Sequence, residues 1–415
     1  MANKIKKIAL TFYLFIVSLS VLVFLQIAYY SFVLPDNFYL SDKSDFTLSA
    51  AFPVIAKNSR QNAVAAGTYE NEQNRMQLYL YGVIPIKSVT VLQTEAPSLT
   101  PLGQPFGLKI LTDGVIVTDY GMVNGINGRC SPAEQGGIEI GDIIISANGI
   151  PVATANELLD AIQKNPQCTT LVVVRNNEEV SLRLTPVKSS QDGLYKLGMW
   201  TKDSCAGIGT LTFYDNERGI YGGLGHSVCD VDTGQLLPIA SGEIVPVDIS
   251  DVTKGCQGSP GELCGDLLPQ VRTGTIEANT ECGVFGIMER CPSSAQPIPM
   301  AFKQEVEIGE AKILTTIKGS QPEEYDIIIE KINYNSSSEV KNMVIRITDS
   351  RLLTEAGGIA QGMSGSPIIQ NGKLVGAVTH VFVNEINRGY GIFAENMYHT
   401  SFSVDGTDGA LQQTG

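Results

Sequence analysis

The chain has 415 residues, which is too long for one ordinary domain and predicts two or three. Its 29 basic and 43 acidic residues leave a net charge of −14, which argues against a nucleic-acid partner because such a partner requires a basic face. The 42 glycines indicate many turns and predict a mostly β fold.

The chain begins with an apolar run long enough to cross a bilayer. Three lysines in the first seven residues precede apolar residues from Ile8 to Tyr30, about the length that a transmembrane helix requires. A cleaved signal peptide has a shorter core and a small-residue cleavage site, which Ala28-Tyr29-Tyr30 does not supply. Residues 1–30 are therefore expected to be an uncleaved single-pass anchor, with a cytoplasmic N-terminus and the rest of the chain outside the cytoplasm.

Residues 31–91 are expected to connect the anchor to the first domain. Residues 31–75 are polar and mixed, and we interpret them as a tether. Gln77–Val91 alternates apolar and polar residues, the pattern of a leading strand.

The eight cysteines do not predict one role. An extracytoplasmic location permits disulfides, and the four cysteines between positions 256 and 291 are close enough in sequence to pair. Free thiols are the alternative. Their spacing fits no metal pattern and the chain has only three histidines, so neither a metal site nor a cofactor is expected.

A short α/β unit is expected over residues 92–190. "FGLKILTDGVIVTDY" predicts two strands joined at Asp113-Gly114, a hairpin signal. Ser131-Pro132 opens a helical turn that Gly136-Gly137 ends, and a strand at Ile143–Ser146 follows. Asn148-Gly149 then turns the chain. Asn156 is the expected cap of the next helix, and "TLVVVRNNEEVSLRLTPV" predicts a closing hairpin.

This unit resembles a PDZ domain, through Ser131-Pro132-Ala133-Glu134, Gly137, Gly141-Asp142-Ile143-Ile144 and Asn148-Gly149. The resemblance implies a groove that binds an extended peptide or a C-terminus as an added strand. The loop that binds the carboxylate is expected around Gly103, Phe106, Gly107 and Leu108. A PDZ fold that serves only as a spacer is the alternative.

Residues 195–404 are expected to form a mostly β domain, because glycine-rich segments that alternate like strands follow Pro186. Residues 405–415 are expected to be a disordered tail.

One serine in this domain has the surroundings of a nucleophile. In Gly362-Met363-Ser364-Gly365-Ser366-Pro367, small residues leave room for a scissile carbonyl beside the Ser364 hydroxyl. The N–H groups of Gly362 and Ser364 are the expected oxyanion donors. Two strands joined by Asn371-Gly372 follow.

A serine nucleophile requires a base, and His226 is the best of the three histidines. His226 lies in the glycine-rich "YGGLGHSVCD" and precedes the serine. His380 is too close to the hairpin of the serine to be favoured, and His399 lies in the terminal segment.

The serine segment resembles the chymotrypsin-like peptidases, whose G-x-S-G-G-P motif leads into such a hairpin. Ser366 replaces the second glycine of that motif. The resemblance implies a double β-barrel in which Val378, Thr379 and His380 form the edge that pairs with the substrate backbone.

The anchor, the PDZ unit, "GLGHS", "GMSGSP" and "THVFVN" together resemble the stage IV sporulation protein B family of PDZ-containing sporulation serine peptidases. The resemblance implies self-cleavage in the N-terminal tether and cleavage of a membrane-bound regulator of a membrane-embedded metalloprotease. It also implies activation of a late sigma factor and a location between forespore and mother cell.

The third catalytic residue is less well defined. The family resemblance assigns it to Asp349 in "VIRITDSRLL", whereas the chymotrypsin-like layout favours Asp248 or Asp251, and a dyad is a further possibility. Two other functions remain as alternatives: a general envelope quality-control peptidase and a non-catalytic PDZ binding module.

Overall fold

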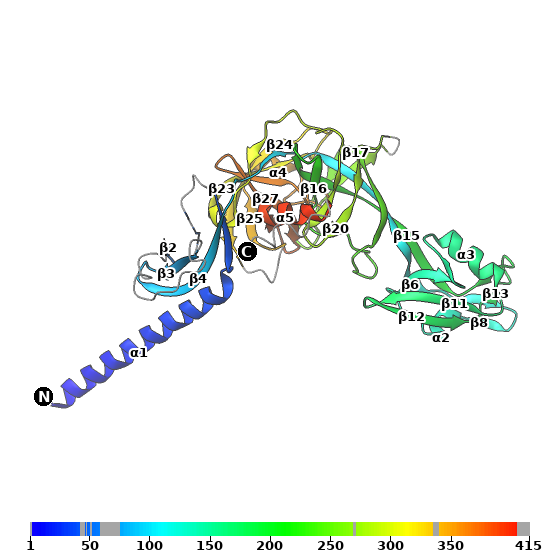
Figure 1. The fold of residues 1–415 in the computed structure, drawn as a ribbon, viewed down its shortest axis with the longest axis horizontal. Coiled ribbons are helices and arrows are strands. Elements are labelled where there is room, and N and C mark those ends of the chain that lie inside the picture. The colour runs from blue at the N-terminus through cyan, green and yellow to red at the C-terminus, as the bar shows by residue number, and fades with distance from the viewer. Residues whose placement is uncertain are drawn as a thin grey trace, which may run out of the picture.

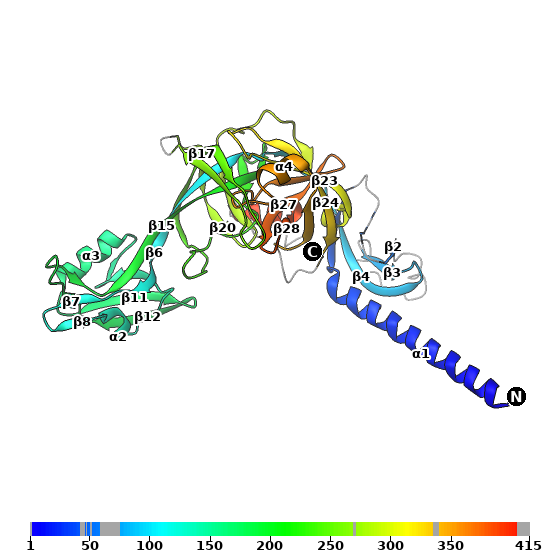
Figure 2. The ribbon, with the colours of Figure 1, turned by 180° about the vertical axis from the view of Figure 1, so that it is seen from behind.

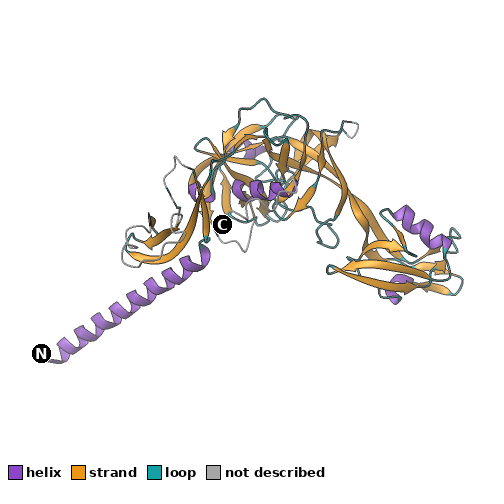
Figure 3. Cartoon of the chain, in the orientation of Figure 1, coloured by secondary structure: helices purple, strands orange, loops and turns teal. Residues whose placement is uncertain are grey.

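The computed structural model describes residues 2–41, 46, 48–49, 52–58, 75–268, 271–334 and 340–404. Figure 1 shows four parts in a row: an N-terminal helix, a small sheet beside its end, a large central β body and a PDZ unit. Strands are the most abundant secondary structure among the described residues (Figure 3). The expected disordered tail at 405–415 lies outside the described residues.

The apolar run forms one helix, α1 (Ala2–Val33), and its span Ile5–Val33 is long and apolar enough to cross a membrane. The described part of the expected tether is folded. It contributes to a four-stranded sheet, called here the juxtamembrane sheet, with the strand order β1 (Asn37–Leu40), β4 (Ile84–Gln93), β3 (Arg75–Leu80) and β2 (Val54–Asn58).

The tether prediction is wrong for these strands because their apolar residues have a core to enter. Phe38, Leu78 and Leu80 are fully buried, in one cluster with residues of the central body such as Val306 and Ile313. The expected leading strand over Gln77–Val91 is also wrong, because this stretch contains the end of β3, the turn at residues 81–83 and most of β4.

The central body contains two six-stranded rings, which confirms the expected double β-barrel. The second ring is closed in the order β23-β24-β25-β28-β27-β26. Its elements, including the short helices beside the ring, are β23 (Gly309–Thr315), β24 (Glu323–Ile332), β25 (Met343–Ile347), α4 (Ser350–Glu355), β26 (Pro367–Gln370), β27 (Lys373–Phe382), β28 (Glu385–Phe393) and α5 (Ala394–Thr400).

The first ring has the order β6-β15-β16-β21-β19-β17 and closes where β17 pairs with both β19 and β6. A bridge between Gly274 of β19 and Met288, the residue after β21, joins these two strands. When the six strands of each ring are numbered along the chain, they follow the same order around both rings. The strands are β6 (Pro105–Tyr120), β15 (Met199–Asp215), β16 (Ile220–Gly223), β17 (Ile239–Thr253), β19 (Gly274–Ile276) and β21 (Gly283–Ile287). Shorter strands at its margins are β5 (Ser98–Pro101), β18 (Glu262–Leu267), β20 (Ala278–Thr280) and β22 (Ile298–Pro299).

The PDZ unit is inserted between the first two strands of this ring. Strands β6 and β15 pair from Thr210↔Pro105 to Met199↔Tyr120, and they run side by side from the central body into the PDZ unit (Figure 2). The hairpin expected at Asp113-Gly114 is therefore wrong: Gly114, with φ +106°, bends one continuous strand. The expected boundaries at 92–190 and 195–404 also separate β6 from the ring to which half of it belongs.

Within the PDZ unit, the other local predictions are confirmed except for the cap of α3. Ser131 caps the short helix α2, Asn148-Gly149 turns the chain with positive φ at both residues, and β11 and β12 form the closing hairpin. The cap of α3 is Thr154 rather than Asn156, because Thr154 and Glu157 form a capping box. The elements are β7 (Val123–Gly125), β8 (Gly128–Cys130), α2 (Pro132–Gln135), β9 (Ile143–Ala147), β10 (Ile150–Pro151), α3 (Ala155–Lys164), β11 (Thr169–Arg175), β12 (Glu178–Leu184), β13 (Val187–Lys188) and β14 (Tyr195–Lys196).

The disulfide alternative finds no support in the structure. Cys256, Cys264 and Cys291, three of the four cysteines close enough in sequence to pair, are thiols.

Candidate active site

Ser364 lies on a tight turn between the two barrels. Gly365, at φ +96°, has no space for a side chain, because a Cβ there would lie 2.0 Å from the Thr210 carbonyl oxygen on β15. Thr210 also donates its N–H to the Ser364 carbonyl, at 3.0 Å. The turn is therefore held by a strand of the opposite barrel, and the half-buried Ser364 side chain sits at the junction of the two rings.

The Ser364 hydroxyl donates to the backbone carbonyl of Thr379, with an Oγ–O distance of 2.6 Å. Thr379 lies on β27, the second strand after the serine. To attack a substrate, the hydroxyl has to leave this carbonyl, and a rotation about the serine χ1 bond achieves that.

Two backbone N–H groups beside the serine are free to bind an oxyanion. Across the part of the chain that the structure describes, the N–H groups of Gly362 and Ser364 have no hydrogen-bond acceptor. Those of residues 363, 365 and 366 all donate to backbone carbonyls. Unengaged donors next to the nucleophile are the requirement of an oxyanion hole.

His226 follows a turn that packs against Thr379. It follows Leu224 and Gly225, whose positive φ angles of 65° and 68° make a sharp turn after β16. A Cβ at Gly225 would lie 3.1 Å from Thr379 Cγ2. The turn that precedes His226 therefore packs against Thr379, the residue whose carbonyl receives the Ser364 hydroxyl.

The hydrogen bond of His226 fixes the tautomer that a general base needs. Its Nδ1 lies 2.8 Å from the Ser227 carbonyl oxygen, and a carbonyl can only accept, so Nδ1 carries the proton. Nε2 then holds the lone pair, and none of the described residues is hydrogen-bonded to it. A backbone carbonyl thus orients the ring, a task that a carboxylate performs in many serine peptidases.

The second histidine of the site is His380, whose ring centroid lies 4.9 Å from that of His226. Burial lowers the pKa of His226. Desolvation, together with His226 and Lys341, lowers the pKa of His380 to about 4, although part of this side chain reaches solvent. Both rings are therefore neutral at neutral pH, as a base awaiting a proton must be.

No carboxylate contacts His226 among the residues that the structure describes. Asp349 instead caps α4: its carboxylate accepts the Arg351 N–H and pairs with the Arg351 guanidinium at 2.9 Å. This arginine holds the pKa of Asp349 at about 2. Asp248 and Asp251 are exposed on β17. The expectation that one of the three completes a triad is not met in this structure.

The residue that holds the histidine loop was missed in the sequence. Asn279 accepts the Val228 N–H at 2.8 Å and donates to the carbonyls of Val228 and Leu237, at 2.8 and 3.0 Å. A lone asparagine in "EANTECG" carries no motif that could have revealed these three bonds. The side chain ties down both ends of the segment that follows His226.

The expected substrate edge is only partly available. Val378 is fully buried and paired on both sides, with Ser366 just before β26 and Gly391 on β28, so it cannot pair with a substrate. The β27–β28 register shifts after Val378, and the exposed His380 lies in that irregular stretch.

Comparison with known proteins agrees with this geometry. Residues 193–398 match the family model described as SpoIVB peptidase S55, and residues 129–175 match a PDZ domain. The chain is a SpoIVB-type S55 serine peptidase with a PDZ domain. The S55 match starts at residue 193, near the end of the PDZ unit, so it leaves out β6, the first strand of the peptidase body.

Other similarities of this S55 peptidase are partial. Over 56 residues it is 41% identical to the serine protease HTRA1 of Xenopus tropicalis, a match that covers 14% of this chain and 12% of that protein. The Rv3671c protease of M. tuberculosis, in an inactive form, is 11% identical with a TM-score of 0.29, over 48% of this chain and 84% of that one. The HtrA-type protease AlgW with a decapeptide is 10% identical with a TM-score of 0.29, over 52% and 56%.

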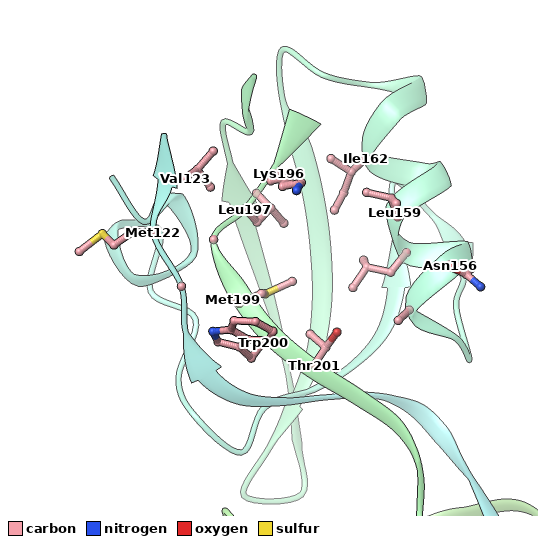
Figure 4. A pocket seen from close by; sticks show the side chains of 14 residues that line it. Met122, Val123, Asn156, Leu159, Ile162, Lys196, Leu197, Met199, Trp200 and Thr201 are labelled. Carbon is pink, nitrogen blue, oxygen red and sulfur yellow. The ribbon is translucent and has the colours of Figure 1, made fainter. Parts of the chain in front are cut away.

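The PDZ unit of the S55 peptidase has a groove, but not at the expected loop. Phe106 and Leu108 are buried in the core of the first barrel, because β6 enters that ring. The groove lies between α3 and the segment Lys196–Thr201, with a cavity of about 440 Å³ (Figure 4). Figure 4 shows Leu159 and Ile162 of α3 facing Met199 across it.

The pH dependence of the S55 peptidase should follow His226. The base is active when neutral, and because burial lowers its pKa, the acid limb of kcat/KM should have its midpoint below the ordinary histidine value of about 6.5. Peptide hydrolysis between pH 4.5 and 8 measures it. The variant His380→Gln should keep the limb, and a midpoint at or above about pH 7 would contradict this assignment.

Proposed function

We propose that this S55 peptidase is anchored in a membrane by α1, cleaves its own N-terminal segment, and cleaves a membrane-bound regulator of a membrane-embedded metalloprotease. In this role it signals late sigma-factor activation in sporulation. The family name supports the sporulation role, and the apolar helix supports the anchor.

We place the N-terminus in the cytoplasm and the peptidase body outside it, in the space between forespore and mother cell. The lysines before the apolar span favour this orientation.

The observation that carries the catalytic part is the environment of Ser364. Its hydroxyl lies beside two unengaged N–H groups and donates to the carbonyl of Thr379. The turn that precedes His226 packs against this same threonine, and the His226 Nδ1–H donates to the Ser227 carbonyl, which leaves Nε2 as the acceptor. Ser364 Oγ attacks the peptide carbonyl while His226 Nε2 takes the proton, and the N–H groups of Gly362 and Ser364 stabilise the oxyanion. His226 then protonates the leaving amine, and water hydrolyses the acyl-enzyme.

Self-processing tests the proposal directly. The full chain is placed in lipid vesicles, and its mass is followed over time beside the inactive variant Ser364→Ala. Wild-type chain that shortens from the N-terminal side, with the variant remaining whole, supports the proposal. Wild-type chain that stays whole and takes up no fluorophosphonate probe would refute it.

The general quality-control alternative places a PDZ domain after the peptidase. Here the PDZ unit lies between the first two strands of the first barrel and shares both with it. This insertion favours a regulatory use of the groove, with the tether or the partner protein as its ligand.

Ion pairs connect the strand beside the groove to the segment that follows His226. Thr201 lines the groove, and the next residue, Lys202, forms ion pairs with Asp230 and Asp232 in the segment after His226. Asp230 is buried and accepts the N–H groups of Asp232 and Thr233. A shift of β15 on peptide binding would therefore act on the segment that positions the base.

Lys202→Met should uncouple groove and active site. Peptides tiled from residues 31–75 are screened for binding to the wild-type chain, and the best binder is added to a peptidase assay. In wild type the binder should change kcat/KM, whereas in Lys202→Met it should bind with similar Kd and change the rate little. Lys164→Met, which removes an exposed lysine of α3, is the matched control. A binder that leaves the wild-type rate unchanged would contradict the regulatory role.

A further inference from the structure

Helix α1 is longer than a bilayer requires. Its candidate span has 29 residues, or about 43 Å at 1.5 Å per residue, whereas the hydrocarbon core is about 30 Å thick. With the basic N-terminus at one surface, the last two turns of α1 emerge at the other. Tyr29 and Tyr30 in these turns are residues typical of a membrane interface.

The juxtamembrane sheet is fixed to these same turns. Tyr30 and Leu34 are buried in its core. The Tyr30 hydroxyl accepts the Phe52 N–H at 3.0 Å, and Lys87 Nζ donates to the Leu34 carbonyl at 2.6 Å. The sheet therefore has a set height relative to the bilayer, and Figure 1 shows it beside the end of α1.

One end of the sheet points back toward the bilayer. Strand β1 continues the chain away from α1 and pairs in parallel with the last residues of β4. Since β4 runs in the same direction, its first residues are on the membrane side, where the turn Tyr81-Gly82-Val83 joins β3 to β4. Phe52 lies at this end too, with its ring 6.1 Å from that of Tyr81.

This end of the sheet is apolar and exposed. We call it the bilayer-facing end and define it by Phe52, Ile55, Tyr81 and Val83, which are all exposed, Val83 to 74%. A patch of large apolar side chains on a soluble surface needs a partner. Its continuity with the emerging turns of α1 identifies that partner as the membrane.

The charge of the sheet fits an anionic surface. The four strands contain Lys57, Arg75 and Lys87 and no acidic residue, in a chain whose net charge is −14. Arg75 pairs with Thr90 at the end of the sheet away from the bilayer. The closest carboxylate before β1, Asp36, pairs with Lys87 at 2.7 Å. Lys57 donates to the Gly82 carbonyl at 2.7 Å, which holds its cation at the bilayer-facing end.

We propose that the bilayer-facing end inserts into the boundary between headgroups and acyl chains of the bilayer that α1 spans. The apolar side chains enter the boundary and Lys57 meets anionic headgroups. Because the sheet shares its core with the second barrel, this second attachment restricts how the peptidase body tilts over the membrane. The inference rests on the proposed anchor role of α1.

Tryptophan fluorescence of the full chain in vesicles tests the proposal. The only tryptophan, Trp200, is replaced by Phe, and Val83→Trp, Phe52→Trp or Ile126→Trp is added. Ile126 is 90% exposed near the tip of the β7–β8 hairpin and serves as the control. Lipids brominated near the headgroup should quench the indoles at 83 and 52 at least about twofold more than the indole at 126.

The outcomes separate the possible failures. Equal quenching at all three positions would overturn the proposal. Blue-shifted emission at positions 83 and 52 that bromine does not quench would overturn it in favour of contact with a second copy. Co-flotation with the vesicles reports α1 alone, so a chain that fails to float refutes the anchor rather than the bilayer-facing end.

Discussion

Ser364→Ala should abolish peptide-bond hydrolysis and leave the fold intact. Losing the nucleophile of a serine peptidase typically lowers kcat by about 10⁴- to 10⁶-fold. The stability cost is small by comparison, because the variant loses one hydrogen bond, to the Thr379 carbonyl, of about 1 kcal/mol. Fluorophosphonate labelling and thermal melting of wild type and variant measure the two effects.

The neighbouring serine provides a matched control. Ser366 is fully buried and hydrogen-bonds to the Met363 carbonyl at 2.6 Å and to Thr315 Oγ1 at 2.9 Å. Ser366→Ala should therefore lower the free energy of unfolding by about 1–3 kcal/mol and still react with the probe. If Ser366→Ala lost labelling while Ser364→Ala kept it, the nucleophile would be misassigned.

His226→Gln should lower kcat/KM nearly as far as Ser364→Ala, because the residues of a catalytic unit act together. His380→Gln should retain activity within about tenfold, since His380 contacts the base but accepts no proton from the serine. Initial rates on one peptide substrate give the comparison. Comparable losses in both variants would show that the two imidazoles act as a pair.

Asp349→Asn tests whether the His226 orientation depends on a carboxylate. Asparagine keeps a capping oxygen at the start of α4, so the fold should persist. In the geometry described here, the Ser227 carbonyl orients His226, and activity close to wild type is expected. A loss as deep as that of His226→Gln would return Asp349 to the catalytic unit, through a conformation that differs from this one.

Ser364 and His226 could be proposed as catalytic residues from the sequence because the glycines that surround them lie in short stretches. The glycines around Ser364 and before His226 lie within a few positions of the residues that they serve. Asn279 acts from more than fifty positions away, and the orienting group of His226 is a backbone carbonyl. Neither leaves a pattern in the sequence.

The domain arrangement was hidden for a different reason. Strand β6 belongs to two cores, with Phe106 and Leu108 in the first barrel and Val115 and Val117 in the PDZ unit. The Asp113-Gly114 signal between them is typical of a hairpin, but pairing with β15 along both halves keeps the strand continuous. Pairing with β15, which lies more than eighty residues away in the sequence, therefore outweighs the turn preference of Asp113-Gly114.

The strand order of the juxtamembrane sheet has a consequence for self-cleavage. Its central strand β4 and its neighbour β3 follow the stretch between Asn58 and Arg75, whereas β1 and β2 precede it and pair with β4 and β3, respectively. A cut in that stretch would leave β1 and β2 on one fragment and β3 and β4 on the other. Strand pairing and the shared core would still hold the two fragments together, as in a split protein that reassembles. Proteolysis alone would then not shed the enzyme from the membrane, and its release would be governed by the rate at which the sheet comes apart.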